Sequence, residues 1–232
     1  MDPVSGVDAD TRPGSRRAQA EATRDLLLRT AERLYAERGL AQVSNRQIVE
    51  AAGQANNSAL AYHIGTRTDL IHAITRSHVE RIAARTQQRV RAARRSRRPR
   101  DHVASLVLPY TEYLASLGNP SWCARFLAQV VTDPALADRV DVDPVLAMKF
   151  LDGVAAVWSH LAELPPAESA LRSQTARVAV IHTCAEQERV AATRGVPADW
   201  SLVGQALTDA VTGLLLAARH RTAVPTARKD CP

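Results

Sequence analysis

Apolar residues recur at helical spacing along most of the chain, and short polar or proline-containing stretches separate these runs. In the first clear run Leu27, Ala31 and Leu34 share one face of a helix predicted over residues 21–38, and Gly39 is its C-terminal stop. The 18 residues at the start of the chain have no apolar period, and we expect a flexible arm there.

Two short helices are predicted next, joined by a polar turn that contains a glycine. The stretch SNRQIVEAAG has a capping-box start, with Ser44 as N-cap and Gln47 three residues later, and ends at Gly53. The second short helix is predicted over residues 58–64. Helices of about two turns are unstable alone, so they must be held by a longer neighbour. This arrangement fits a helix-turn-helix, whose second helix enters the major groove of DNA.

A longer helix starts at Thr66 or Thr68 as its N-cap and must stop near Pro99. Beyond it the pattern stays helical between proline-containing junctions, over residues 101–117, 120–132, 143–164, 166–194 and 198–220. The chain is 46% hydrophobic but only 4% aromatic, which suits helices packed on helices. The predicted fold is therefore all-α.

The positive charge is concentrated in the first half of the chain. Residues 1–100 carry 19 arginines against 10 acidic residues, whereas residues 101–232 carry 11 basic and 14 acidic residues. Arginine forks pair well with phosphate oxygens, so the basic half is the candidate partner of a polyanion. The plainer interpretation is a set of solvated helix faces.

The stretch LLLRTAERLYAERGLAQVSNRQIVEAAGQANNSALAYHIGTRTDLIHAI, residues 26–74, resembles the DNA-binding domain of TetR/AcrR-type transcriptional regulators. The resemblance implies a three-helix DNA-binding domain followed by a larger helical domain for ligand binding and dimerisation. The expected organisation is an arm over 1–18, a DNA-binding domain over 19–65, a helical domain over 66–223 that begins with a connecting helix over 66–98, and a loose tail over 224–232.

The resemblance also implies which residues contact DNA. Bases would be read by Asn57, Ser58 and Ala61, and the phosphate backbone would be touched by Tyr62, His63 and Arg67. Of Asn56 and Asn57, one caps the second short helix and the other can offer its amide to a base edge or a phosphate. A phosphate is also favoured at the helix start formed by Ser44, Asn45 and Arg46. Thr66, beside Arg67, completes the expected DNA-binding set.

The arginine-rich stretch over residues 89–100 is a possible second DNA surface or a solvated connector. In proteins of this family the corresponding helix leads away from the duplex, which favours the connector.

Two further sites are expected in the C-terminal half. By resemblance, the last two helices form a homodimer interface through apolar stripes that contain Val178, Ile181, Ala185, Leu202, Leu207, Val211 and Leu214. The middle helices hold most of the bulky side chains, which suit either a small-molecule pocket or a core. The pocket candidates are Tyr110, Tyr113, Trp122, Phe126, Met148 and Trp158.

Other classes of protein have little support in the sequence. No catalytic motif occurs, so we expect no enzyme, and no His, Cys or Asp cluster has metal-ligand spacing, so no cofactor or metal is expected. The three cysteines are widely spaced, which indicates a reducing compartment. No apolar run approaches the ~18 residues of a membrane span, and a cytoplasmic protein is expected.

The sequence-based hypothesis is therefore a homodimeric transcriptional regulator that binds a palindromic operator on double-stranded DNA and is released by a small molecule. A repressor is favoured over an activator. Two alternatives stay open. One is a DNA-binding or architectural protein that ignores ligands, and the other is an all-helical scaffold without a nucleic-acid function.

Overall fold

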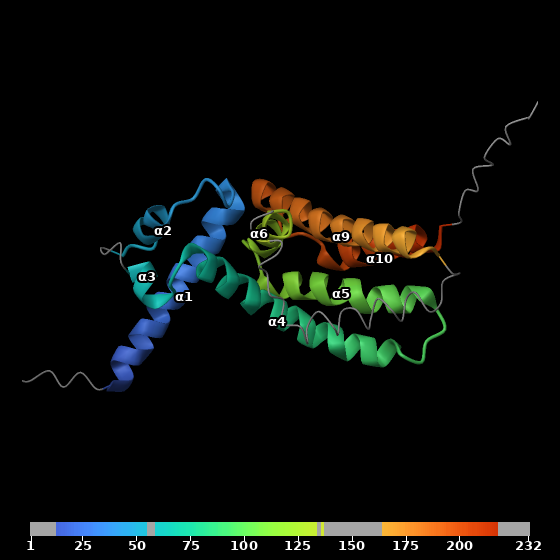
Figure 1. The fold of residues 1–232 in the computed structure, drawn as a ribbon, viewed down its shortest axis with the longest axis horizontal. Helices are drawn as coiled ribbons and strands as arrows, with labels where there is room; N and C mark the ends of the chain where they lie inside the picture. The colour runs from blue at the N-terminus through green and yellow to red at the C-terminus, as the bar shows by residue number, and fades with distance from the viewer. Residues whose placement is uncertain (1–12, 55–58, 134–135, 137–163, 218–232) are drawn as a thin grey trace, which may run out of the picture.

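The computed structural model describes residues 13–54, 59–133, 136 and 164–217, and within these ranges the chain is built from helices with no strand (Figure 1). The predicted all-α fold is confirmed. The helices are α1 (Pro13–Arg38), α2 (Asn45–Ala51), α3 (Ala59–His63), α4 (Arg67–Ala93), α5 (Pro99–Leu117), α6 (Cys123–Val130), α9 (Pro166–Arg194) and α10 (Trp200–Leu216). The helix expected over 143–164, residues 1–12 of the arm and the tail over 224–232 lie outside the described residues.

The first three helices form a small reading head at one end of the molecule (Figure 1). α1 packs against α2, α3 and the beginning of α4, because the apolar face of each short helix needs a longer partner. The side chains at the centre of the head are almost fully buried; they include Leu27, Ala31, Leu34, Ile48, Val49, Leu60 and Leu70.

α1 begins at Pro13, eight residues before the predicted start, and so includes residues 13–18 of the expected arm. Proline is well suited to the first helical position, because its ring fixes the helical φ and the missing N–H is not needed there. One turn further on, the Arg17 guanidinium lies 3.1 Å from the Glu21 carboxylate. The apolar period starts only later, so this polar first part could not be seen from hydrophobic spacing.

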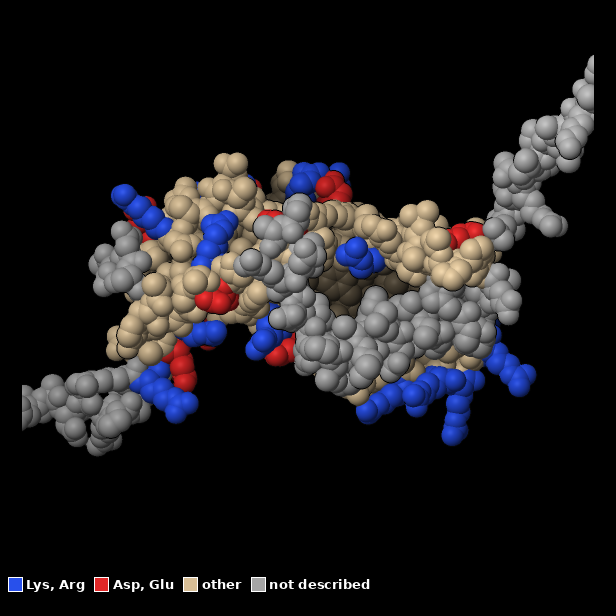
Figure 2. Space-filling model, viewed as in Figure 1, with Lys and Arg blue, Asp and Glu red and all other residues tan. Residues whose placement is uncertain are grey.

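α4 leads from the head along the rest of the molecule (Figure 1). It has 27 residues, which at ~1.5 Å each gives a length of about 40 Å. The exposed arginines of the 89–100 stretch gather at its far end and at the start of α5, remote from the head (Figure 2). Arg89 pairs with Glu112, and Arg100 lies 2.6 Å from Asp209. This position supports the connector interpretation of the stretch.

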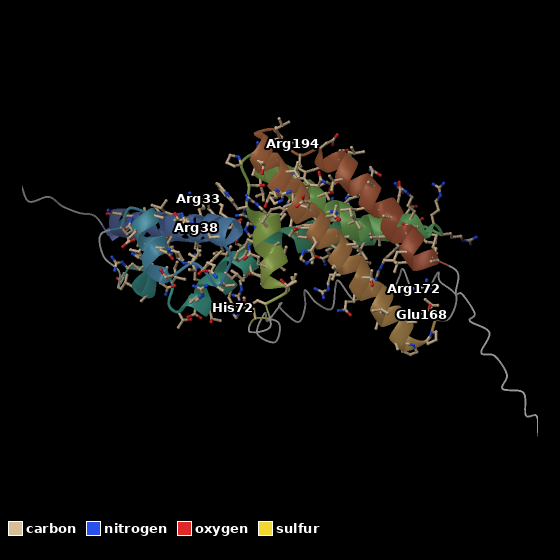
Figure 3. All side chains as sticks on the ribbon, turned by 90° about the horizontal axis from the view of Figure 1, so that it is seen from above. Arg33, Arg38, His72, Glu168, Arg172 and Arg194 are labelled. Atoms are coloured by element: carbon tan, nitrogen blue, oxygen red, sulfur yellow. The ribbon has the colours of Figure 1, made fainter. Side chains whose placement is uncertain are left out.

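The C-terminal body packs α5 between α4 and α10, while α6 lies against α1 and α9. Gly204 allows the close approach of α10 to α5, because a Cβ atom there would lie only 2.5 Å from Thr111 Oγ1. Arg172 of α9 donates hydrogen bonds to the Leu215 and Ala217 carbonyls at the end of α10, at 3.0 and 2.8 Å, and to Glu168 at 2.8 Å (Figure 3). The cation satisfies carbonyls that have no partner inside their own helix.

α6 begins at Cys123, three residues after the predicted start at residue 120, because a side chain from another helix caps it. Its N-cap residue Trp122 makes no capping bond of its own. The buried Glu188 carboxylate of α9 accepts hydrogen bonds from the backbone N–H groups of Ala124 and Arg125, at 3.2 and 3.0 Å. These are first-turn N–H groups, which have no carbonyl partner within the helix.

The other boundaries are close to the prediction. α9 begins and ends as predicted, α5 begins two residues early at Pro99, and α10 is shorter at both ends than the expected 198–220 helix. Among the helices described, none is long and apolar enough to cross a bilayer.

Candidate nucleic-acid interface

The start of α2 is held by the predicted capping box. Ser44 accepts a hydrogen bond from the Gln47 backbone N–H at 3.3 Å, and the Gln47 side chain accepts one from the Ser44 N–H at 2.8 Å. Asn45 and Arg46 follow with exposed side chains, and Arg46 lies 2.7 Å from Glu50 one turn later. An exposed pair of this kind contributes little to stability, so Arg46 is free to exchange its partner for a phosphate.

Tyr62 is the most exposed large apolar residue among the described residues of the head. It is 83% exposed on α3, and the edge of the neighbouring His63 ring contacts it, with centroids 4.9 Å apart. Ala61 is exposed beside it, and His63 is partly exposed. Three of the predicted contact residues therefore lie on an open part of α3. Asn56, Asn57 and Ser58 lie outside the described residues.

Thr66 caps α4 rather than Thr68. Its hydroxyl accepts from the Asp69 N–H at 3.1 Å, and the Asp69 carboxylate accepts from the Thr66 N–H at 2.8 Å. The Thr66 hydroxyl also donates to Asp69 Oδ2 at 2.7 Å, and this bond, with the one from the Thr66 N–H, lowers the pKa of the Asp69 carboxyl. Gly65, with φ of +109°, precedes the cap, and a Cβ atom there would lie 2.7 Å from Asp69 Oδ2. Thr66 thus fixes the angle between α3 and α4.

Arg67 points into the head and not towards a phosphate. Its guanidinium donates to the backbone carbonyls of Leu40 and Val43, which are in the loop between α1 and α2, and lies 5.1 Å from the centre of the Tyr35 ring. The expected direct contact with the DNA backbone stays a prediction, since these contacts use two of the five N–H donors of the guanidinium. The inward position favours a role within the head, where Arg67 holds the loop that leads to Ser44.

Arg67→Ala is expected to weaken specific DNA binding without changing its salt dependence. The loop over residues 39–44 would lose two hydrogen bonds to a cation, at about 1.5–3 kcal/mol each, and α2 would lose its fixed position. A direct phosphate contact would instead make the log–log salt slope shallower by about one unit. Salt titration of the variant beside the wild-type protein separates the two roles. A shallower slope in the variant would show that Arg67 contacts a phosphate directly.

The predicted dimer residues fall on two different faces. Leu207 and Val211 are buried within the chain, where α10 packs on α5, and are therefore left out of any interface with a partner. Val178 and Leu202 are 42% and 65% exposed. The other three, Ile181, Ala185 and Leu214, are partly exposed. The apolar pattern could not separate the faces, because α10 carries apolar residues both on its buried face and on an exposed face.

The aromatic residues predicted to line a pocket belong to the core where they are described. Phe126 is fully buried and stacks on Tyr35 of α1, with ring centroids 6.2 Å apart. Tyr113 is 1% exposed and its hydroxyl lies 2.6 Å from His78 Nδ1. These contacts correct the pocket assignment for both residues, because their surfaces are occupied by other helices.

Two more pocket candidates are placed at the edges of this core. Trp122 donates from Nε1 to Glu37 at 3.2 Å. Tyr110 is buried, its hydroxyl has no hydrogen-bond partner within the part of the chain that the structure describes, and burial raises the pKa of this hydroxyl. Met148 and Trp158 lie outside the described residues.

A cavity of about 280 Å³ lies between the end of α5 and the α9–α10 connection. It is lined by Gly118, Asn119, Ser121, Glu188, Asp199 and Trp200, among others. None of the predicted pocket residues lines it, and Glu188 contributes a carboxylate whose hydrogen bonds are already made within the chain.

The sequence missed the residues that connect distant helices. Glu188, Arg67 and His78 were not assigned these roles, because their partners are 24 to 67 residues away along the chain. One signal was available for Glu188. It is a charged residue one helical turn after Cys184, on the face of α9 that is buried, and a charge in such a position indicates a partner from another helix.

Comparison with solved structures identifies the fold of the chain. No family model matches the chain, and no curated protein matches it. Among solved structures, the TetR-family transcriptional regulator PfmR from Thermus thermophilus matches with a TM-score of 0.54 and 14% sequence identity, over 84% of this chain and 96% of that one. The chain has the fold of a TetR-family regulator.

A second solved structure supports the same fold. NalD of Pseudomonas aeruginosa, the secondary repressor of the MexAB-OprM multidrug efflux pump, matches with a TM-score of 0.54 and 18% identity, over 87% of this chain and all of NalD. Both matches extend over the head and the body together, so the likeness is not limited to the DNA-binding motif that the sequence resembles.

Proposed function

We propose that the protein is a transcriptional repressor. It binds a palindromic operator as a homodimer and leaves it when a small molecule binds. The observation that carries the proposal is the open face of α3, where Tyr62 is 83% exposed on a head built from two short helices packed on α1. A large aromatic side chain exposed to this degree is ordinary at a surface that a partner covers. The fold that the chain shares with the regulator PfmR and with the repressor NalD supports the same conclusion.

The proposed dimer uses the exposed faces of α9 and α10. On α10 the exposed apolar positions are Leu202, Ala206, Ala210, Gly213 and Leu216, which recur at helical spacing. The small residues in the middle allow a second helix to approach closely. A twofold dimer presents two heads to two half-sites about one turn of DNA apart.

The proposed response to a small molecule is supported by the fold likeness, since NalD represses a multidrug efflux pump. A ligand-independent regulator is the second candidate. It is favoured by the use of Tyr113 and Phe126 in the core. A footprint on DNA upstream of the protein's own gene, followed by titration of the complex with a metabolite library, discriminates between them. The ligand-independent protein would release its DNA with no compound.

The first test is a gel shift at increasing salt. Specific binding is expected to weaken with a log–log slope of about −0.9 for each neutralised phosphate. A protein with no affinity for any genomic fragment at low salt would be a scaffold, and the proposed function would be lost.

Tyr62→Ala is expected to weaken operator binding about tenfold at each half-site, because a hydroxyl hydrogen bond to a charged phosphate contributes roughly 1.5 kcal/mol. Tyr62→Phe should show most of this loss if the hydroxyl makes the contact. Both variants should melt at the wild-type temperature, since the side chain is 83% exposed in the free protein. Wild-type affinity in both variants would remove Tyr62 from the interface.

A further inference from the structure

Three side chains that commonly bind metal converge where the reading head meets the body. Glu32 lies on α1, His78 lies on α4, and Cys123 is the first residue of α6. A carboxylate oxygen, a ring nitrogen and the cysteine sulfur all lie within 4.8 Å of one another. Cys123 is fully buried, His78 is 7% exposed, and the Glu32 side chain is 14% exposed at the edge.

Ordinary pairing leaves part of this cluster unsatisfied. His78 Nδ1 lies 2.6 Å from the Tyr113 hydroxyl, which accounts for one ring nitrogen. The other nitrogen, Nε2, lies 3.1 Å from Glu32 Oε1, within ion-pair distance, and has no hydrogen-bond partner among the described residues. A buried ring nitrogen without a partner is costly. An ion pair between His78 and Glu32 would account for the position of Nε2, but it would not involve the Cys123 sulfur beside them.

We propose that Glu32, His78 and Cys123 form a binding site for a divalent ion of the zinc class. Sulfur, imidazole nitrogen and carboxylate oxygen are the donors that zinc takes in proteins, and three protein ligands with water as the fourth is a common arrangement. Zinc bonds of ~2.0–2.3 Å place tetrahedral ligand atoms about 3.5 Å apart. The oxygen and nitrogen are already close to this spacing at 3.1 Å, and no pair of donors needs to close by more than about 1.3 Å.

Ion binding replaces the proton of the Cys123 thiol. Burial, with the nearby Glu32 and Glu188 carboxylates, raises the pKa of this thiol well above its usual value. On binding, the S–H bond breaks, the sulfur donates its electron pair to the ion, and the proton leaves to solvent. Tyr113 keeps the His78 ring oriented so that Nε2 faces the Glu32 carboxylate, as an outer hydrogen-bond partner does at known metal sites.

The three helices that supply the ligands are those that set the position of the head. α1 belongs to the head, α6 belongs to the body, and α4 continues from one to the other. A contact between α1 and α6 already exists beside the site, since Gln129 donates to the Tyr35 carbonyl and accepts from the Leu40 N–H, each at 2.8 Å. A bound ion would join all three helices and favour one angle of the head. This consequence for DNA rests on the proposed function, whereas the site itself does not.

Cobalt(II) titration of the reduced, metal-free, full-length protein tests the site. The expected result is one ion per chain, with a sulfur-to-cobalt charge-transfer band in the near ultraviolet and strengthened visible bands that zinc(II) removes by displacement. A spectrum that stays that of the free aqueous ion would overturn the site.

Matched variants locate the ion. Cys123→Ser should lose the charge-transfer band, whereas Cys184→Ser should keep it, because Cys184 is equally buried but belongs to no such cluster. Tyr113→Phe changes no ligand and should weaken zinc binding by ~10–100-fold. If Cys123→Ser does not fold, the Tyr113→Phe result decides. Unchanged zinc affinity in Tyr113→Phe, or an unchanged band in folded Cys123→Ser, contradicts the assignment.

Operator binding with and without zinc(II) tests the coupling separately. The expected result is a change in operator affinity of at least fivefold in wild-type protein and Cys184→Ser, and none in Cys123→Ser. Cobalt binding with unchanged operator affinity would overturn the coupling and leave a structural metal site. Cobalt binding by a protein that binds no DNA under any condition would contradict the proposed function and leave the site intact.

Discussion

Glu188→Ala should lower the free energy of unfolding by about 3–5 kcal/mol, the cost of breaking a buried ion pair by removing one partner. Glu188 is 2% exposed and accepts hydrogen bonds from four donors at once. Its carboxylate accepts from the Ser121 hydroxyl at 2.7 Å, from two first-turn N–H groups of α6, and from Arg125 Nε at 3.2 Å. The truncation leaves a largely buried cation without its counter-ion and two helix N–H groups without an acceptor.

For a chain of this size the loss corresponds to a fall in melting temperature of roughly 10 °C. Glu186→Ala is the matched control, because Glu186 lies two residues earlier on α9 and pairs with Arg189 on the surface, with both side chains more than half exposed. That change should cost less than about 1 kcal/mol. Thermal melts of the two variants measure the difference, and equal midpoints would show that the buried network does not stabilise α6.

Double substitution tests whether the charge itself is the problem. Removing Arg125 as well, as in Glu188→Gln with Arg125→Met, should recover part of the loss, since a buried pair replaced by neutral groups is often close to neutral in stability. A double variant that is as unstable as Glu188→Ala would assign the cost to the lost helix cap and not to the unpaired cation.

Local chemistry explains what the sequence predicted well. The capping box at Ser44, a threonine cap at the start of α4, the stop at Gly39 and the length of α9 follow from residues close to one another in the chain. The resemblance over residues 26–74 predicted the three-helix head. The fold likeness to PfmR and NalD covers the head and the C-terminal body together.

Contacts between distant helices explain what the sequence did not predict. The inward direction of Arg67 was not predicted, because position in a motif does not give the direction of a side chain. The carbonyls that it contacts belong to a loop more than 20 residues earlier. Glu32, His78 and Cys123 lack any local ligand spacing, since each comes from a different helix. Leu207 and Val211 were assigned to a partner interface because one apolar stripe resembles another until α5 is in place.

Ala206→Glu should convert the proposed dimer to monomers. The residue is exposed in the single chain, near the middle of the apolar face of α10. In a twofold interface the change would bury an unpaired carboxylate twice, once from each protomer. Operator affinity should fall by roughly 10²–10⁴-fold, because each head would then bind its half-site without the linked second head.

The matched control is Gln205→Glu, which adds the same charge one residue earlier. Gln205 accepts a hydrogen bond from Arg100 at 2.9 Å, so a carboxylate there keeps a cationic partner and lies away from the small residues of the face. Light scattering should report a dimer for Gln205→Glu and a folded monomer for Ala206→Glu, with circular dichroism unchanged in both. A folded Ala206→Glu protein that is still a dimer would show that the two copies meet elsewhere, and the exposed face of α10 would then need another occupant.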